Sequence, residues 1–253
     1  MRALITGATS GIGKEMAFYL HRMGWQLVLT GRNEEMLKCM AQKFGSSTKY
    51  IALDLANPDA PQKLYDFCRG MRIDFLINNA GFGIFGEFSE TSLAGELEMI
   101  DVNVRSVHIL TKLFLRDFEK RGSGYILNVA SVAGFMTGPL MSTYYASKNY
   151  VVRLTLAIRE ELRRKRSGVN VSVLCPGPVN TDFNNRAGVS FSLKAADPKF
   201  VARYAIEQTL KGRAVIVPGL MIQLGLIGAS LCPPQLQAAV VCELQKKKKG
   251  SGR

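Results

Sequence analysis

The sequence predicts a single α/β domain built on a doubly wound, mostly parallel sheet of seven strands flanked by helices. Short, almost unbroken apolar runs alternate with amphipathic segments, and parallel strands buried on both faces have this character. Neither an internal repeat nor a long linker divides the chain of 253 residues. A chain of this length buries a sizeable core as one domain.

Seven apolar runs are predicted to form the strands of this sheet. In chain order they are Ala3–Thr6, Gln26–Thr30, Lys49–Leu53, Ile73–Ile77, Tyr125–Val129, Val169–Leu174 and Ala214–Val217. The segments with helical periodicity between them are Ile12–Met23, Glu34–Phe44, Asp59–Arg69, Leu93–Lys120, Tyr144–Arg166 and Pro198–Lys211. Because the crossover between parallel strands is right-handed, this alternation places helices on both faces of the sheet.

The predicted domain ends after the seventh strand and covers residues 1–217. Within it, residues 180–197 have mixed polarity and weak periodicity, which is typical of a substrate loop or lid. The last four residues, 250–253, resemble a cloning remnant and carry no functional interpretation.

Residues 218–249 form a C-terminal extension whose role the sequence leaves open. No charged residue occurs from Ala214 to Cys242, and Lys246–Lys249 follow shortly after. Prolines and glycines interrupt the apolar segment, which makes it a poor transmembrane span. Three alternatives remain for the extension: packing on the domain, packing on a partner subunit, or contact with an anionic membrane surface.

The net charge of +13 predicts a basic, solvated surface rather than a nucleic-acid site. Lys246–Lys249 and Arg253 supply five of these charges, and aromatic residues do not alternate with the basic ones. The five cysteines form no CxxC pair and the two histidines lie far apart, so no metal site is expected. Reduced thiols, and a first apolar run too short for a signal peptide, predict a cytoplasmic protein, with membrane association as the alternative.

A glycine-rich segment, Thr6–Gly13, joins the first strand to the first helix and predicts a nucleotide site. Gly7 permits a tight turn, Gly11 lets a phosphate approach the backbone, and Gly13 allows the helix to pack closely on the strand. The helix N-terminus offers free N–H groups to a pyrophosphate. The other candidate contacts of this loop are Thr9, Ser10 and Ile12.

The end of the second strand favours NADP(H) over NAD(H). Gly31 occupies the place where an enzyme that uses NAD has an acidic residue for the ribose hydroxyls, and Arg32 follows it. A guanidinium suits a 2′-phosphate, although an ordinary surface arginine is the alternative and NAD(H) is not excluded. Asp54 and Leu55, after the third strand, are candidate adenine contacts, but Asp54 would serve equally as a helix cap.

A tyrosine and a lysine open the helical segment after the fifth strand. Tyr144 and Lys148 are four residues apart, which places both side chains on one helix face. This spacing also arises by chance, so the motif acquires meaning only from its neighbours. Ser131 lies just after the fifth strand, and Asn103 lies in the preceding long helix.

Taken together, these motifs resemble those of the short-chain dehydrogenase/reductase family. The motifs stand in the family's order between Arg2 and about Val217: Thr6–Gly13 (TGxxxGIG), Asn78–Gly81 (NNAG), Asn103, Ser131, Tyr144, Lys148, and Pro176-Gly177 followed by Thr181. The resemblance implies a Rossmann-type domain and a catalytic set of Asn103, Ser131, Tyr144 and Lys148.

The chemistry of the set agrees with that resemblance. The Lys148 ammonium and the charge of an oxidised nicotinamide would favour the phenolate and lower the pKa of Tyr144 from its usual value near 10. Tyr144 would then exchange a proton with a substrate carbonyl oxygen, and Ser131 would hydrogen-bond the same oxygen. The resemblance also implies that Lys148 binds the nicotinamide ribose and that Asn103 holds a water in a proton relay. It further implies a group of cofactor contacts at Asn79, Ala80, Pro176, Gly177, Val179 and Thr181.

These observations predict an NADPH-dependent oxidoreductase that interconverts a ketone or aldehyde with an alcohol. Apolar residues in the loops near the strand ends favour an apolar substrate: Phe82, Ile84, Phe85, Phe135, Met136, Leu140, Met141 and Phe183. The alternative is a nucleotide-binding regulatory protein or a membrane-peripheral scaffold on the same fold.

The C-terminal extension departs from the short glycine-rich end of many family members. It resembles instead the branch that contains acyl-chain and steroid ketoreductases, several of which associate with membranes. This difference favours a homodimer through the segments Leu93–Lys120 and Tyr144–Arg166 over the common tetramer.

Overall fold

The computed structural model describes residues 1–181, 195–230 and 232–249. Most of the expected substrate loop at 180–197, including Phe183, and the tail at 250–253 lie outside the described residues.

The seven predicted strands form one parallel sheet. They are β1 Arg2–Thr6, β2 Gln26–Gly31, β3 Lys49–Ala52, β4 Phe75–Asn78, β5 Gly124–Val129, β6 Val169–Leu174 and β7 Val215–Ile216. Their order in the sheet is β3-β2-β1-β4-β5-β6-β7, and every neighbouring pair is parallel. The predicted doubly wound fold is therefore confirmed. Because the winding reverses between β1 and β4, a crevice opens beyond the carboxyl ends of these strands.

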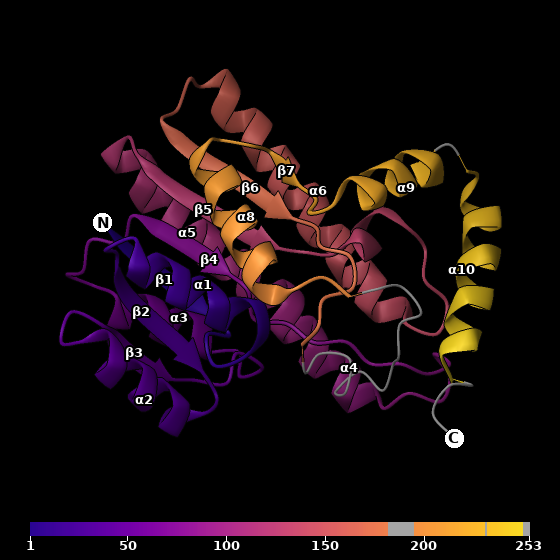
Figure 1. Cartoon of the computed structure of the whole chain (residues 1–253), viewed down its shortest axis with the longest axis horizontal. Helices are drawn as coiled ribbons and strands as arrows, with labels where there is room; N and C mark the ends of the chain where they lie inside the picture. The colour runs from indigo at the N-terminus through magenta and orange to yellow at the C-terminus, as the bar shows by residue number, and fades with distance from the viewer. Residues whose placement is uncertain (182–194, 231, 250–253) are drawn as a thin grey trace.

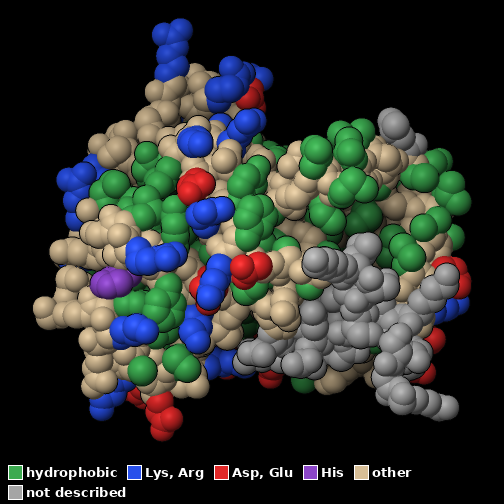
Figure 2. Space-filling model, viewed as in Figure 1, with side chains coloured by type: hydrophobic (Ala, Val, Ile, Leu, Met, Phe, Trp, Pro, Cys, Tyr) green, Lys and Arg blue, Asp and Glu red, His purple; other side chains and the backbone are tan. Residues whose placement is uncertain are grey.

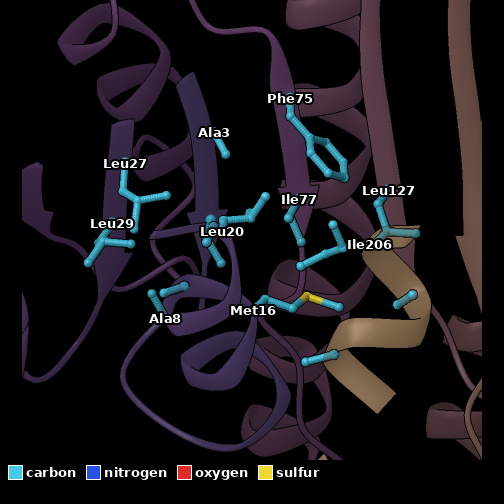
Figure 3. Close-up of a cluster of buried hydrophobic side chains, with 14 of the residues drawn as sticks. Ala3, Ala8, Met16, Leu20, Leu27, Leu29, Phe75, Ile77, Leu127 and Ile206 are labelled. Atoms are coloured by element: carbon cyan, nitrogen blue, oxygen red, sulfur yellow. The ribbon is translucent and has the colours of Figure 1, made fainter. Parts of the chain in front are cut away.

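Helices cover both faces of the sheet (Figure 1). On one face lie α1 Gly11–Arg22, α2 Glu34–Phe44 and α8 Pro198–Leu210. On the other lie α3 Ala60–Phe67, α5 Ser106–Arg121 and α6 Ser142–Arg164. Figure 3 shows the core between the sheet and the helices α1 and α8. Met16 and Leu20 of α1 and Ile206 of α8 pack there on apolar side chains of the strands.

The segment Leu93–Lys120, predicted as one helix, is interrupted by a π-helical turn. α4 spans Leu93–Ile100, η1 spans Asp101–Arg105 with π-helical hydrogen bonds, and α5 follows. A single wide turn leaves the apolar periodicity on either side almost unchanged, so the pattern of residues does not reveal it. The turn carries Asn103 and buries it completely.

The C-terminal extension forms two helices, α9 Leu220–Ser230 and α10 Pro234–Lys249. α10 is joined to the loop that follows β5: the backbone N–H of Thr137 donates to Oε1 of Gln237 over 3.1 Å. Val241 and Gln245, one turn apart, face the domain and are buried. Of the three alternatives for this extension, α10 shows the first, which is packing on the domain. Among the described residues, no helix combines the length and the apolar character that a membrane crossing requires.

Candidate active site

A cavity of about 580 Å³ lies at the carboxyl ends of the strands. Its walls come from the loops after β1, β2, β3, β4, β5 and β6, from the start of α6 and from α10. The cavity brings together most of the predicted site residues: Gly7, Thr9, Ser10, Gly11, Ile12, Arg32, Asp54, Leu55, Asn79, Ala80, Ser131, Tyr144, Lys148, Pro176, Gly177, Val179 and Thr181. Gly13 and Asn103 lie behind the wall of the cavity.

Asn79 braces the glycine loop at one end of the cavity. Its Nδ2 donates to the carbonyl oxygens of Thr6 and Gly7 over 3.0 and 3.1 Å. The Thr6 hydroxyl in turn accepts the N–H of Asn79 over 2.9 Å. A Cβ at Gly13 would overlap Nδ2 of Asn79, so glycine at this position permits the close packing.

The part of the loop that is predicted to bind phosphate has glycine at two positions with left-handed backbone. Gly7 and Gly11 have φ of +64° and +52°, in the left-handed region that favours glycine. A Cβ at Gly7 would lie 2.9 Å from Cα of Ala80. The loop can therefore turn back toward β4 and present the N-terminus of α1 to the cavity, which suits a pyrophosphate.

Arg32 and Asp54 flank the far end of the cavity. The Arg32 guanidinium lies 4.0 Å from a carboxylate oxygen of Asp54, and both side chains are more than half exposed. Asp54 also accepts the backbone N–H of Ala56 over 3.1 Å, which holds the turn after β3. At Gly31, a Cβ would lie only 3.1 Å from Cγ2 of Thr9. An acidic side chain at this position would therefore crowd Thr9 of the glycine loop.

Tyr144 is one of two buried titratable groups in the predicted catalytic set. It is 8% exposed, and its side chain is hydrogen-bonded to Ser131. Burial raises the pKa of Tyr144 well above its usual value, and the Ser131 hydrogen bond offsets only part of this effect. Ser131 Oγ also accepts the backbone N–H of Ala133 over 3.1 Å, which orients the serine at the start of η2 Val132–Phe135.

Lys148 lies beside Tyr144 and is buried with it. Its Nζ donates to the carbonyl oxygen of Val129 over 3.0 Å and lies 5.8 Å from the centre of the Tyr144 ring. Burial lowers the pKa of Lys148 from 10.5 to about 8. The expected lowering of the Tyr144 pKa is not what the chain alone shows: burial raises this pKa, and the Ser131 hydrogen bond, which lowers it, only partly compensates.

Asn103 occupies a supporting position behind Lys148. Its Nδ2 donates to the carbonyl oxygen of Phe82 over 2.9 Å and to Oγ of Ser147 over 3.1 Å. Its Oδ1 accepts the N–H of Phe82 over 3.1 Å. A Cβ at Gly81 would lie 2.9 Å from this oxygen and 3.1 Å from Nζ of Lys148, so glycine leaves room for both groups. The water-relay role of Asn103 stays a prediction.

The apolar half of the cavity differs in part from the sequence-based prediction. Of the apolar residues predicted to line the substrate site, Phe82, Met136 and Met141 are in the cavity wall. The other described members, Ile84, Phe85, Phe135 and Leu140, are not part of that wall.

Several lining residues were missed by reasoning from the sequence: Glu98, Val102, Tyr145, Val241, Leu244 and Gln245. The last three come from α10, which lies far along the chain from the motifs. The sequence contains one signal for them: Val241 and Leu244 are apolar and three residues apart, a spacing that places both on one helix face. Among the described residues, no cluster of side chains could hold a metal ion.

The model of the family described as short chain dehydrogenase matches residues 1–189. The chain belongs to this family. Its Rossmann-type fold agrees with that of a short-chain dehydrogenase from Sphingobium yanoikuyae in complex with NADPH. That structure is 29% identical with a TM-score of 0.81, and the match covers 94% of this chain and 98% of that one.

Curated relatives of this short-chain dehydrogenase include 17-beta-hydroxysteroid dehydrogenase type 3 of Rattus norvegicus, 35% identical over 203 residues, or 77% of this chain and 65% of the relative. Very-long-chain 3-oxoacyl-CoA reductase of Mycosarcoma maydis is 36% identical over 181 residues, or 68% of this chain and 51% of the relative. The matched segment therefore spans about half to two-thirds of the length of these relatives.

Proposed function

We propose that this short-chain dehydrogenase reduces a ketone or aldehyde to an alcohol with NADPH and also catalyses the reverse reaction. The observation that carries the proposal is that Ser131 and the buried Tyr144 and Lys148 lie together in the wall of a cavity that the glycine loop also lines. One end of this cavity suits a nucleotide, and the other end is apolar and suits a carbonyl compound.

The residues of the cavity fit a nicotinamide dinucleotide. Gly7 and Gly11 leave the space that a pyrophosphate needs at the start of α1. Pro176, Gly177, Val179 and Thr181 continue the wall beyond β6, on the side where Lys148 lies. When bound, this cofactor supplies or accepts the hydride.

The chain's own residues would hold the carbonyl and move the proton. Ser131 and Tyr144 are hydrogen-bonded to each other, so both hydroxyls can converge on one carbonyl oxygen. Tyr144 keeps its proton at neutral pH because burial raises its pKa, and it can donate that proton as the alkoxide forms. Lys148, held by the Val129 carbonyl, would stabilise the phenolate that this transfer leaves.

Replacing Tyr144 by phenylalanine tests the proton donor. Tyr144→Phe is expected to lower kcat for ketone reduction by about 100-fold or more, because general acid catalysis is lost. NADPH affinity, measured by fluorescence titration, should stay within a few-fold. Tyr150→Phe on the same helix, whose hydroxyl bonds only His108 over 2.7 Å among the described residues, is the matched control and should keep full activity. Full turnover by Tyr144→Phe would refute the assignment.

The lowered pKa of Lys148 predicts an alkaline limit for reduction. The ammonium form stabilises the phenolate, and that form is lost as pH rises through about 8 rather than through 10.5. At saturating NADPH, kcat/KM for the ketone is therefore expected to be constant below that pH and to fall above it. A profile that stays flat to about pH 10 would show that the proton of Lys148 is not needed.

The structure around Gly31 supports NADP(H) as the cofactor. Thr9 leaves little room for an acidic side chain at position 31, and the exposed Arg32 guanidinium lines the same end of the cavity. A 2′-phosphate could take charge-assisted hydrogen bonds from Arg32 there. Solved relatives include one with NADPH and another, from Burkholderia phymatum, with NAD (26% identity, TM-score 0.81, covering 89% of this chain and 91% of that one).

Cofactor discrimination is tested by removing the guanidinium. Arg32→Ala should weaken NADPH binding roughly 10- to 100-fold, as expected for a lost hydrogen bond between charged groups, and should change NADH binding little. Arg22→Ala removes an exposed arginine at the end of α1 and should affect neither cofactor. Equal losses of NADPH and NADH affinity in Arg32→Ala would contradict a 2′-phosphate contact.

We also propose that the substrate is apolar and that the C-terminal extension contacts an anionic membrane. Apolar side chains line the cavity on the α10 side, and the relatives are named for steroid and very-long-chain acyl substrates.

The membrane contact is supported by the exposed surface of α9 and α10. These helices expose large apolar residues: Leu220, Met221, Leu224, Ile227, Leu236, Val240 and Leu244. Figure 2 shows hydrophobic side chains gathered over this end of the molecule. Lys246–Lys249 end α10, which suits anionic headgroups.

Binding to lipid vesicles tests this surface. Co-sedimentation with vesicles that contain phosphatidylserine is expected, and it should weaken with rising salt and with vesicles of phosphatidylcholine alone. The double variant Leu236→Ser/Val240→Ser should reduce binding several-fold, whereas Met23→Ser, at an exposed apolar residue just after α1, should not. Equal sedimentation of the double variant and the wild type would contradict the assignment.

A regulatory or scaffold protein on the same fold is the alternative. The presence of Ser131, Tyr144 and Lys148 together in one cavity weighs against it, because binding alone would not require all three. The homodimer and the tetramer stay predictions, which light scattering would distinguish.

A further inference from the structure

The substrate side of the cavity contains a polar pair that the proton-transfer chemistry does not use. Tyr145 follows Tyr144 on α6, and Gln245 lies on α10; both line the cavity. Nε2 of Gln245 donates to the hydroxyl oxygen of Tyr145 over 2.9 Å. Met136 and Val241 are among the apolar residues that line the same cavity.

Both side chains are held firmly in place. Gln245 is 1% exposed, which is unusual for an amide on a terminal helix. The ring of Tyr145 packs directly on the backbone of Gly138, where a Cβ would overlap it. It also meets the Tyr144 ring edge to face, with 6.1 Å between the ring centres.

The direction of the hydrogen bond determines what Tyr145 can do. Its oxygen accepts from Gln245, and among the described residues the Tyr145 hydroxyl makes no second hydrogen bond. The phenol proton can therefore be donated to another acceptor. Burial raises the pKa of Tyr145, so the phenol stays protonated at neutral pH.

We propose that Tyr145, oriented by Gln245, donates a hydrogen bond to a second oxygen of the substrate, separate from the carbonyl that Tyr144 and Ser131 hold. The inference rests on the proposed reductase function. It narrows the substrate class to a largely apolar ketone that carries another acceptor, such as a hydroxyl, ester or further carbonyl oxygen. Because the two tyrosine rings are in contact, this second oxygen belongs near the reacting carbonyl rather than at the far end of a long chain.

Gln245 is a positioning residue in this assignment. Without its N–H donor, the Tyr145 hydroxyl could rotate and lose its fixed direction, although the ring would stay packed on Gly138. α10 thereby contributes to specificity as well as to closure of the cavity. A purely structural contact between α10 and α6 would instead affect all substrates alike.

The test compares ketones of equal chain length with and without one added ester or hydroxyl oxygen at graded distances from the carbonyl. The wild type is expected to prefer one of the oxygenated ketones by roughly 10-fold in kcat/KM, as for one well-made hydrogen bond. Tyr145→Phe should remove this preference, because it should lower kcat/KM for the oxygenated ketone by a larger factor than for the plain ketone. Gln245→Leu should reduce the preference, and Tyr150→Phe should preserve it.

The outcomes separate this inference from the proposed function. If the wild type reduces the plain and oxygenated ketones equally well, or if Tyr145→Phe slows all of them by the same factor, the second-oxygen contact is overturned and the reductase function stands. If NADPH binds but no ketone is reduced by the wild type, the proposed function fails and the inference with it. Thermal unfolding of each variant verifies that the fold is intact.

Discussion

The hydrogen bonds of Asn79 hold together the two strand ends on which the site depends. β1 and β4 are neighbours in the sheet, yet their following segments leave toward opposite faces. Asn79 joins these segments by donating to the carbonyls of Thr6 and Gly7, and Gly13 gives it the space to do so. The glycine loop is thus fixed relative to the walls that carry Tyr144 and Lys148, and it forms one end of the cavity.

Burial has opposite consequences for the two titratable residues at the centre of the site. It raises the pKa of Tyr144 and lowers that of Lys148, because in each case the charged form loses its hydration. Before a cofactor binds, the site therefore favours a protonated tyrosine next to a lysine that can lose its charge near pH 8. Such a pair suits the release of a proton to a carbonyl oxygen, since the donor is retained until a charge develops next to it.

The C-terminal extension reaches from the candidate active site to the molecular surface. Val241 and Gln245, one turn apart on α10, face inward, and Gln245 is hydrogen-bonded to Tyr145. Leu236 and Val240 of the same helix are exposed. One helix thus contributes a polar contact inside the cavity and an apolar surface outside it. Leu244 belongs to both regions, because it lines the cavity while remaining 54% exposed.

The sequence by itself determined the sheet, the order of its strands along the chain and the position of the glycine loop after the first strand. Apolar runs and the glycine segment Thr6–Gly13 are local patterns that can be read from the sequence. Because the strands are parallel, their carboxyl ends lie at the same edge of the sheet. Only the tertiary structure decided the π turn at Asn103, the direction of the pKa shift at Tyr144 and the place of α10. These features depend on burial and on contacts between residues as distant as Tyr145 and Gln245, which no local pattern encodes.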